Sequence, residues 1–289
     1  MKTFETPEPI TVDLELGVGD VQIDASDRSD TTVDVLPSDP KKKRDVDAAA
    51  ETRVEFVNGH LRIRTPKGGW KQWVSREGES VDVRVGLPAG SRVHVDAGVA
   101  SIRSTGRLGE CRFKTGMGDV SLDEVGALQL KTGFGDINVD RAGKAELASG
   151  SGSMRIAAID GPAAVKNSNG DTWIGDVTAE ARVSAANGTI RIDRARAGIV
   201  AKTACGDVRL GDVAKGAIVA QSAAGRVDVG VREGSAVWLD LDTKFGRVTN
   251  DLEASSRPGP DDNVVEIHAQ TSYGDITVHR VHVAAEGRQ

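Results

Sequence analysis

The sequence predicts an all-β fold: a single-stranded β-solenoid (β-helix or β-roll type) of about nine coils of 17 to 21 residues, preceded by an elaborated N-terminal β-layer. Three observations predict it. A glycine-centred motif returns every 17 or 18 residues through the middle of the chain, and apolar residues alternate with polar ones on both sides of that glycine. The 3.6-residue period of an amphipathic helix is missing, so helices are nearly excluded.

Composition supports thin, layered β-structure rather than a bulky globular core. Of the 289 residues, 38% are hydrophobic but only 3% are aromatic, and 34 are glycine. Small and β-branched side chains suit tightly stacked sheets. The formal net charge of −6 argues against a nucleic-acid-binding protein, because neutralising phosphates requires a clustered basic surface.

The first residues, Met1 to Pro7, lack the apolar stretch of a signal peptide, and no run approaches the roughly 18 apolar residues that span a bilayer. We therefore expect a cytoplasmic protein without a transmembrane segment, with peripheral association at a membrane as the alternative. Cys111 and Cys205 lie about five coils apart in the repeat, or roughly 24 Å at about 4.8 Å per strand. That separation excludes an intrachain disulfide and agrees with a reducing compartment.

Residues 1–96 are predicted to form the N-terminal β-layer. One coil is indicated around Gly19-Asp20, a charged insertion with Lys41 to Arg44 follows Pro37, and Asn58-Gly59 marks a hairpin. This layer is expected to cover the first coil, since terminal repeats need protection from edge-to-edge pairing. Residues 97–283 are assigned to the solenoid repeats and 284–289 to a tail, all in one continuous structural unit.

The recurring glycine is expected to form the corner between two short strands of each coil. Such a corner requires a positive φ or close packing, and an aspartate after it can accept hydrogen bonds from nearby turn amides. The predicted corner residues are Gly118, Asp119, Gly135, Asp136, Gly170, Asp171, Gly188, Gly206, Asp207, Gly225, Gly246, Gly274 and Asp275.

Taking each corner glycine as position 0, positions −7 and −5 are apolar in nearly every coil, as in Ile199 and Phe113, and so are most residues at +2 and +4. Position −3 is small or hydroxylated throughout. The coils should stack, each hydrogen-bonded in parallel to the next, so that the apolar positions form ladders in a narrow core.

The run from Val85 to Asp96, followed by Lys-Thr-Gly-x-Gly-Asp-Val/Ile at Lys114 to Val120 and Lys131 to Ile137, resembles the bacterial putative-adhesin β-strand-repeat family. This is an uncharacterised-domain family with LiaG-like members, and the resemblance covers roughly Glu5 to Val283. It implies the repeat fold and a link to cell-envelope stress or adhesin-like interactions.

Two features are candidate partner contacts. Trp70 and Trp73 share one glycine-containing loop with basic neighbours, which is typical of a protein or membrane-interface contact, although the rings could instead fold back over the solenoid end. Outward position −4 carries basic residues, and an anionic ligand could bind there; the alternative is charge that keeps exposed strands soluble. These basic residues are Lys114, Lys131, Lys166 and Lys202, with Arg155, Arg191 and Arg209 at position +3.

No pattern indicates an active site, a cofactor or a metal. The corner aspartates superficially resemble calcium-binding β-rolls, but those repeats are nine residues long and place the aspartate differently. His279 and His282 would point to opposite faces of a strand and have no third ligand. Cys111 is expected to be buried and inert, and Cys205 has no nearby histidine.

These observations favour a non-enzymatic scaffold or binding protein whose partner is an unknown protein or an anionic envelope surface. The first alternative is a self-assembling protein that stacks through its solenoid ends into homo-oligomers. A polysaccharide-active enzyme is a further alternative, and it would require an acidic pair within roughly 5 to 10 Å in a groove.

Overall fold

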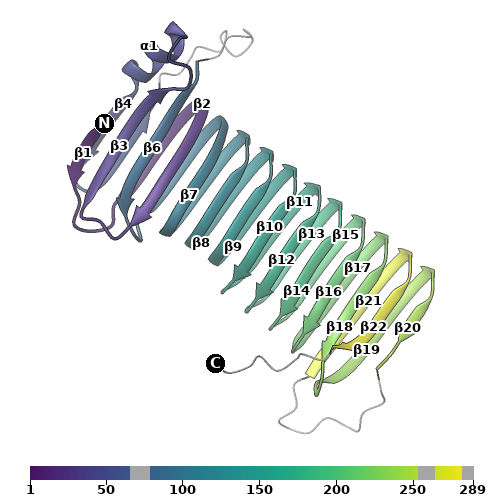
Figure 1. Cartoon of the computed structure of the whole chain (residues 1–289). Coiled ribbons are helices and arrows are strands. Elements are labelled where there is room, and N and C mark those ends of the chain that lie inside the picture. Colours follow the sequence, from purple (N-terminus) through teal and green to yellow (C-terminus); the bar gives the residue numbers. More distant parts are fainter. Residues whose placement is uncertain (66–78, 253–263, 282–289) are drawn as a thin grey trace. The chain divides into compact units, whose positions relative to one another are not determined.

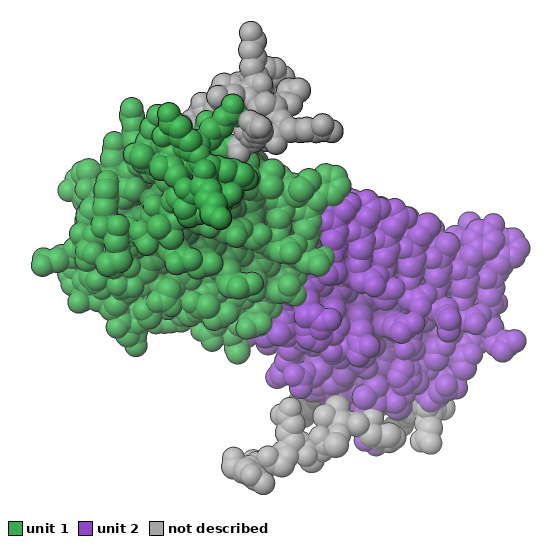
Figure 2. Space-filling model, turned by 45° about the horizontal axis from the view of Figure 1, so that its top comes forward, with its two compact units in different colours: residues 1–143, 147–149 green, residues 144–146, 150–289 purple. Residues whose placement is uncertain are grey.

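The computed structural model describes residues 1–65, 79–252 and 264–281, most of which lie in β-strands (Figure 1). Two compact units are formed: unit 1 by Met1–Gly143 and Leu147–Ser149, and unit 2 by Lys144–Glu146 and Gly150–Gln289 (Figure 2). In each unit, strands of successive coils pair in parallel, which confirms the predicted all-β solenoid.

Unit 1 is built from long, bending strands and one helix. Its elements are β1 (Lys2–Glu5), β2 (Thr11–Ser26), β3 (Asp30–Pro37), α1 (Lys43–Glu51), β4 (Arg53–Val57), β5 (His60–Arg64), β6 (Val81–Pro88), β7 (Arg92–Met117), β8 (Val120–Phe134) and part of β9 (Ile137–Ser151). β7 continues through its own corner and pairs in parallel with β2 and with β8.

The first coil of the sequence is not the outermost coil of unit 1. β2 pairs with β7 from Thr11 opposite Arg92 to Ala25 opposite Gly106. The same residues of β2 pair on their other edge with β5 and then β6. Residues 60–64 and 81–88 therefore lie outside the first coil, as expected of an N-terminal β-layer that covers it.

An antiparallel layer completes this end of unit 1 and confirms the predicted N-terminal β-layer. β4 pairs with β5, β3 pairs with β6, and β1 pairs with β3. Asn58 and Gly59 have φ values of 50° and 75°, the left-handed pair that a two-residue hairpin turn requires.

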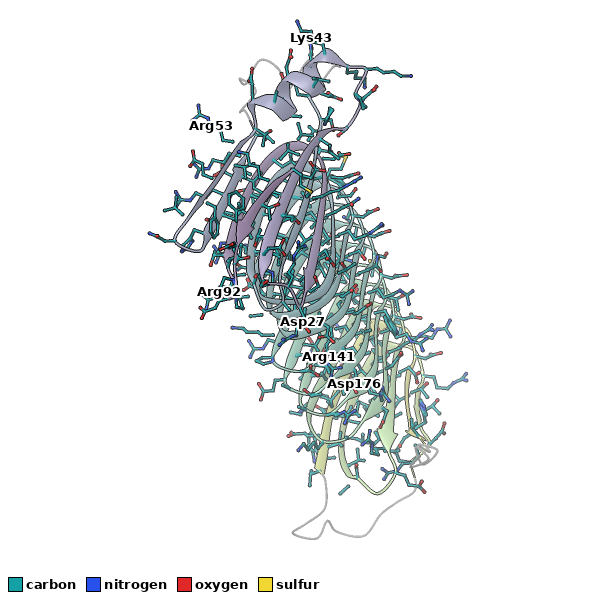
Figure 3. All side chains as sticks on the ribbon, turned by 60° about the vertical axis from the view of Figure 1, so that its left-hand side comes forward. Asp27, Lys43, Arg53, Arg92, Arg141 and Asp176 are labelled. Carbon is teal, nitrogen blue, oxygen red and sulfur yellow. The ribbon has the colours of Figure 1, made fainter. Side chains whose placement is uncertain are left out.

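The charged insertion forms a helix, contrary to the prediction that helices are nearly excluded. α1 begins within the basic cluster, with Lys43 labelled in Figure 3. Its Asp45 is only 2% exposed and accepts hydrogen bonds from the amides of Asp39 and Ser80, both at 3.1 Å. This carboxylate fixes the first turn of the helix against the neighbouring backbone. The segment lies outside the solenoid repeat, and the prediction of fold class was based on that repeat.

Unit 2 has two short strands per coil, and each strand pairs with a strand of a neighbouring coil. Its strands are β10 (Met154–Ile159), β11 (Ala163–Asn169), β12 (Thr172–Val177), β13 (Ala181–Asn187), β14 (Ile190–Ala195), β15 (Ile199–Cys205), β16 (Val208–Val213), β17 (Gly216–Ala224), β18 (Val227–Arg232), β19 (Ala236–Phe245), β20 (Val248–Asn250), β21 (Val264–Tyr273) and β22 (Ile276–Val281). The odd-numbered strands from β11 to β17 form one parallel face and the even-numbered strands from β10 to β18 form another.

The last coil of the sequence is inserted between two earlier ones. β17 pairs with β21, and β21 pairs on its other edge with β19. β22 likewise lies between β18 and β20. The coil of β19 and β20 is therefore outside the coil of β21 and β22, and the expectation that each coil stacks on the next one in sequence is wrong here.

The core consists of the predicted apolar columns. Positions −7 and −5 are buried in both units, as in Phe113 at 1% and Ile199 at 0% exposure, except in the outer coil of β19, where Leu239 and Leu241 are only half-buried. Ile190 and Ile192 beyond the corner are buried as well. Cys111 is buried as predicted, and burial raises the pKa of its thiol to about 12. At that pKa the thiol is inert near neutral pH.

Corner glycines are required by both conformation and space. Gly170 has a φ of 126°, and a Cβ placed on it would lie 2.2 Å from the carbonyl oxygen of Gly152 in the neighbouring coil. The other predicted corner glycines share this positive φ except Gly246, where close packing, the second of the two expected requirements, applies instead. There the constraint is space alone, since a Cβ would lie 1.9 Å from the Gly274 oxygen.

Candidate binding surface at the coil corners

The corner aspartates join one coil to the next. Asp171 Oδ1 accepts a hydrogen bond from the Thr189 amide at 2.8 Å, and Asp207 Oδ1 accepts one from the Arg226 amide at 2.9 Å. The bonded amide is a nearby backbone amide, as expected, and it lies in the neighbouring coil rather than in the turn of the aspartate itself. In the same way, Asp119 accepts a hydrogen bond from the Asp136 amide, and Asp275 accepts one from the Arg247 amide.

Beneath the corner lies a buried column of polar side chains at position −3. Ser222 Oγ donates a hydrogen bond to the Gly206 carbonyl at 2.9 Å, and Thr271 Oγ1 donates to the Gly225 carbonyl at 2.9 Å. The acceptor is again the corner carbonyl of a neighbouring coil. These bonds satisfy backbone oxygens that the tight turn leaves outside the strand ladder.

Position −1, just before the corner glycine or, in the coil of β7, before Ala100, carries exposed apolar side chains in unit 1. These side chains are Val18 at 37%, Val99 at 39%, Met117 at 52% and Phe134 at 58% exposure. Val18 pairs with Val99 across β2 and β7, and Met117 pairs with Phe134 across β7 and β8. We call these four residues the apolar ladder.

A hollow of about 360 Å³ lies beside the apolar ladder. Val18, Val99 and Met117 line it on one side, and Asp20 and Asp82 contribute carboxylates. Asp82 accepts hydrogen bonds from Ser38 Oγ at 2.5 Å and from the Asp20 amide at 3.3 Å. The lining of the hollow therefore combines apolar side chains of the ladder with two carboxylates.

Unit 2 fills position −1 differently. Asn187 Nδ2 donates to Asn169 Oδ1 at 2.9 Å, so this stretch of the column is polar. In the last two coils of the stack, position −1 is aromatic: Phe245 of β19 and Tyr273 of β21 stack with their ring centroids 5.0 Å apart, and each is more than 60% exposed.

A family model described as Toastrack DUF4097 matches residues 10–279 of the sequence. The chain belongs to the Toastrack family. The match spans the apolar ladder and the corner columns of both units, and it confirms the resemblance to an uncharacterised putative-adhesin family.

This Toastrack chain is similar to solved structures of proteins described as putative adhesins and as a putative lipid binding protein. A putative adhesin from Parabacteroides merdae has 11% identity and a TM-score of 0.39, and one from Bacteroides fragilis has 11% and 0.34; in each case 97% of this chain and 95% of the other are covered. A putative lipid binding protein from Parabacteroides distasonis has 12% identity, a TM-score of 0.29 and coverages of 97% and 96%. No curated protein sequence matches the chain.

The four predicted lysine contacts are exposed but do not form one continuous column. Lys114 pairs with Lys131 across β7 and β8, and its Nζ lies 3.2 Å from Asp96 Oδ2. Lys166 and Lys202 each pair with Ser184 across neighbouring strands, so one coil without a lysine at this position lies between them. Their role as partner contacts stays a prediction.

Trp70 and Trp73 lie outside the described residues, as does His282. A different tryptophan is placed in the Toastrack repeat: Trp173 sits at position +3, with the Arg155 guanidinium 4.9 Å from its ring centroid. Its Nε1 donates to Asp193 Oδ2 at 2.9 Å. Arg155 and Trp173 both occupy position +3 of adjacent coils, so the repeat in the sequence could have predicted that they are neighbours.

Within the described ranges, no group of three histidine, cysteine, aspartate or glutamate side chains is arranged to hold a metal ion. His279 Nδ1 lies 3.4 Å from Asp228 Oδ1, an ion-pair geometry when the ring is protonated. No helix among the residues described is long and apolar enough to cross a membrane.

Proposed function

We propose that this Toastrack chain is a non-enzymatic scaffold that binds a partner protein along the apolar ladder of unit 1. The observation that carries the proposal is the alignment of Val18, Val99, Met117 and Phe134 at one side chain per coil. Scattered exposed apolar residues are ordinary on a protein surface, whereas a contiguous row beside a hollow is typical of an interaction site.

The surroundings of the ladder favour a partner segment that is apolar and positively charged. Asp20 and Asp82 line the hollow, and Asp119 follows the corner next to Met117. Carboxylates along the edge of an apolar strip repel an anionic surface and attract lysine or arginine side chains. A protein segment therefore fits this strip better than an anionic membrane does.

The test uses two fluorescein-labelled model peptides, one that alternates leucine with lysine and one that alternates leucine with glutamate. Fluorescence anisotropy with the wild-type protein is expected to show binding of the lysine peptide only. The double variant Met117→Ser/Phe134→Ser is expected to weaken binding about tenfold or more, because two anchor side chains are lost.

The matched control is Val46→Ser/Val57→Ser, which removes two exposed apolar side chains of unit 1 outside the ladder. It should bind the lysine peptide like the wild type. Equal loss of binding in both double variants, or equal affinity for the two peptides, would contradict the proposal.

We further propose that the natural partner belongs to the cell-envelope stress response and that the chain meets it from the cytoplasmic side. The resemblance of the repeat to LiaG-like proteins supports the first part, and the experiment below tests the second. Fractionation of cells expressing the tagged chain, followed by crosslinking from a photoreactive residue at position 117, tests both parts. Crosslinks only to soluble metabolic enzymes would argue against them.

The second candidate function is self-assembly through a solenoid end. Among the described strands, β19 is paired on one edge only, with β21. An open edge can pair with another chain, although Asp240, Asp242 and Lys244 give this edge the charges with which natural edge strands resist pairing. Size-exclusion chromatography with light scattering decides: concentration-dependent oligomers support self-assembly, and a monomer at every concentration excludes it.

A further inference from the structure

A groove of about 450 Å³ opens in unit 1, none of the apolar-ladder residues line it, and arginines from neighbouring strands do. Arg84 of β6, Gln22 of β2 and Arg103 of β7 are paired across three adjacent strands, with Gln22 in the middle. The two arginine Cα atoms are thus separated by about two strand spacings, or roughly 10 Å. That separation allows two long side chains to converge on one small ligand over Gln22.

The two arginines are exposed, and neither has a hydrogen-bond or ion-pair partner in the described part of the chain. The carboxylates that share the groove already have partners. Asp24 accepts a hydrogen bond from Thr105 Oγ1 at 3.2 Å, and Asp34 lies 3.4 Å from the amino group of Met1. The guanidinium groups of Arg84 and Arg103 are therefore available to a ligand.

A third arginine of the groove is held in a fixed position. Arg28 donates from Nε and Nη2 to the two carboxylate oxygens of Asp30, at 2.9 and 3.1 Å, and its side chain is only 24% exposed. Its remaining nitrogen, Nη1, lies over Gly86, where a Cβ would come within 1.9 Å of it. The absence of a side chain at Gly86 makes the room for this guanidinium.

We propose that Arg28, Arg84 and Arg103, together with Gln22, bind a phosphate group; we call this set the arginine groove. Guanidinium groups present paired N–H donors whose fork matches the oxygens of phosphate, and several of them around one anion share its charge. The amide of Gln22 and the hydroxyl of Thr32, another lining residue, add neutral donors. The arginine groove is distinct from the apolar ladder, so this inference does not depend on the proposed function.

The first experiment is isothermal titration calorimetry with inorganic phosphate at low ionic strength. The wild type is expected to bind, and Arg84→Gln/Arg103→Gln is expected to weaken binding about tenfold or more, since two charge-assisted contacts are removed. The matched control is Arg53→Gln/Arg92→Gln. It makes the same change in net charge at exposed arginines that do not line the groove, both labelled in Figure 3.

A third variant tests Arg28 without changing any charge. Gly86→Ala should displace its guanidinium and lower phosphate affinity while Arg84 and Arg103 stay intact. Urea unfolding of each variant shows whether unit 1 is still folded. In an HSQC spectrum, phosphate should shift the side-chain amide of Gln22 in the wild type and in the control.

Co-sedimentation with vesicles identifies the source of the phosphate group. Binding to phosphatidic acid vesicles but not phosphatidylcholine vesicles, lost in Arg84→Gln/Arg103→Gln, identifies a lipid headgroup. Phosphate binding without sedimentation identifies a soluble phosphate compound. A wild type that binds no inorganic phosphate, or a control that loses affinity as much as the groove variant, would overturn the inference.

Discussion

Three residues of each coil have separate roles at the corner. In coils such as those of Gly170, Gly206 and Gly225, the glycine allows the chain to turn against a neighbouring carbonyl. An aspartate, where it follows the glycine, accepts an amide of the adjacent coil, and the side chain at position −3 donates to a corner carbonyl where it carries a hydrogen-bonded hydroxyl. Because two of these contacts join different coils, the corner column stabilises the stack as well as the turn.

Two effects make glycine necessary at the corners, the left-handed φ and the lack of room for a Cβ, and a pair of alanine variants can separate their costs. Gly170→Ala is expected to lower the free energy of unfolding by about 3 kcal/mol, because a left-handed φ and a clash with the Gly152 oxygen act together. Gly234→Ala is the matched control: its φ is 83°, but nothing lies within 4 Å of the added Cβ. It should lose only about 1 kcal/mol. Urea unfolding followed by circular dichroism measures both, and equal losses would show that space is unimportant.

Position −3 offers a matched pair of serines. Ser222 donates to the Gly206 carbonyl, whereas Ser149 Oγ, equally buried, has no hydrogen-bond partner among the described residues. Ser222→Ala should therefore lower the free energy of unfolding by about 1 kcal/mol more than Ser149→Ala. Urea unfolding of the two variants gives the difference. A larger loss for Ser149→Ala would contradict the assigned hydrogen bonds.

At the scale of elements, the decisive feature is the order of the coils at the two chain ends. β2 lies between β5 and β7, and β21 lies between β17 and β19. The first and last coils of the sequence therefore have neighbours on both edges. Strands that would fray at the end of a stack in sequence order are held from two sides.

The inserted coil predicts unequal effects of two similar substitutions at position −7. Ile267 of β21 is fully buried, whereas Leu239 of β19 is half-buried in the outer coil. Ile267→Ala should lower the free energy of unfolding by about 3 kcal/mol and Leu239→Ala by about 1 kcal/mol. Hydrogen exchange should also protect the amides of β21 more than those of β19. The reverse ranking is expected only if the coils stack in sequence order.

The contact between β19 and β21 is also expected to depend on pH. His268 Nδ1 lies 3.1 Å from Asp240 of β19 and its Nε2 lies 3.0 Å from Glu266, and these hydrogen bonds raise the pKa of the histidine. A group whose pKa is raised on folding contributes stability that is fully present below its unfolded pKa, about 6.5, and lost as pH rises through the folded value. Wild type should therefore lose stability relative to His268→Gln as pH is raised from 6 toward 8. Melting temperatures across this range measure the effect, and parallel profiles would exclude it.

For the whole molecule, stability is expected to come from contacts between adjacent coils without a bound ion. Asp119, Asp171, Asp207 and Asp275 each use a carboxylate oxygen to accept a neighbouring amide. Asp207 also pairs with Arg209 at 2.8 Å. Because these carboxylates already accept hydrogen bonds from backbone amides, we expect them not to bind calcium in the way that a β-roll does.

Calcium chloride and EDTA should accordingly leave the melting temperature unchanged to within about 1 °C. An ion that binds neither the folded nor the unfolded protein does not change the unfolding equilibrium. Differential scanning calorimetry is the measurement. A rise with calcium that Asp171→Asn abolishes would show that the corner column binds the ion.

Local pattern was enough to predict each coil. Glycine recurrence and the alternation around it identify two strands and a corner, and buried residues such as Phe113 and Ile199 occupy the predicted columns. The hairpin at Asn58-Gly59 could be predicted for the same reason, because its turn depends on adjacent residues. α1 was missed because its support, the contact of Asp45 with Ser80, comes from a distant part of the chain.

The pattern along the chain specifies the fold class, the corners and the residues that face the core. Which coil stacks on which follows only from the three-dimensional arrangement of the strands. Every coil presents the same columns, so periodicity specifies the register between two coils but not the identity of the partner. The same holds for the candidate sites: Val18 meets Val99, and Gln22 lies between Arg84 and Arg103, only because coils from separate parts of the chain are stacked.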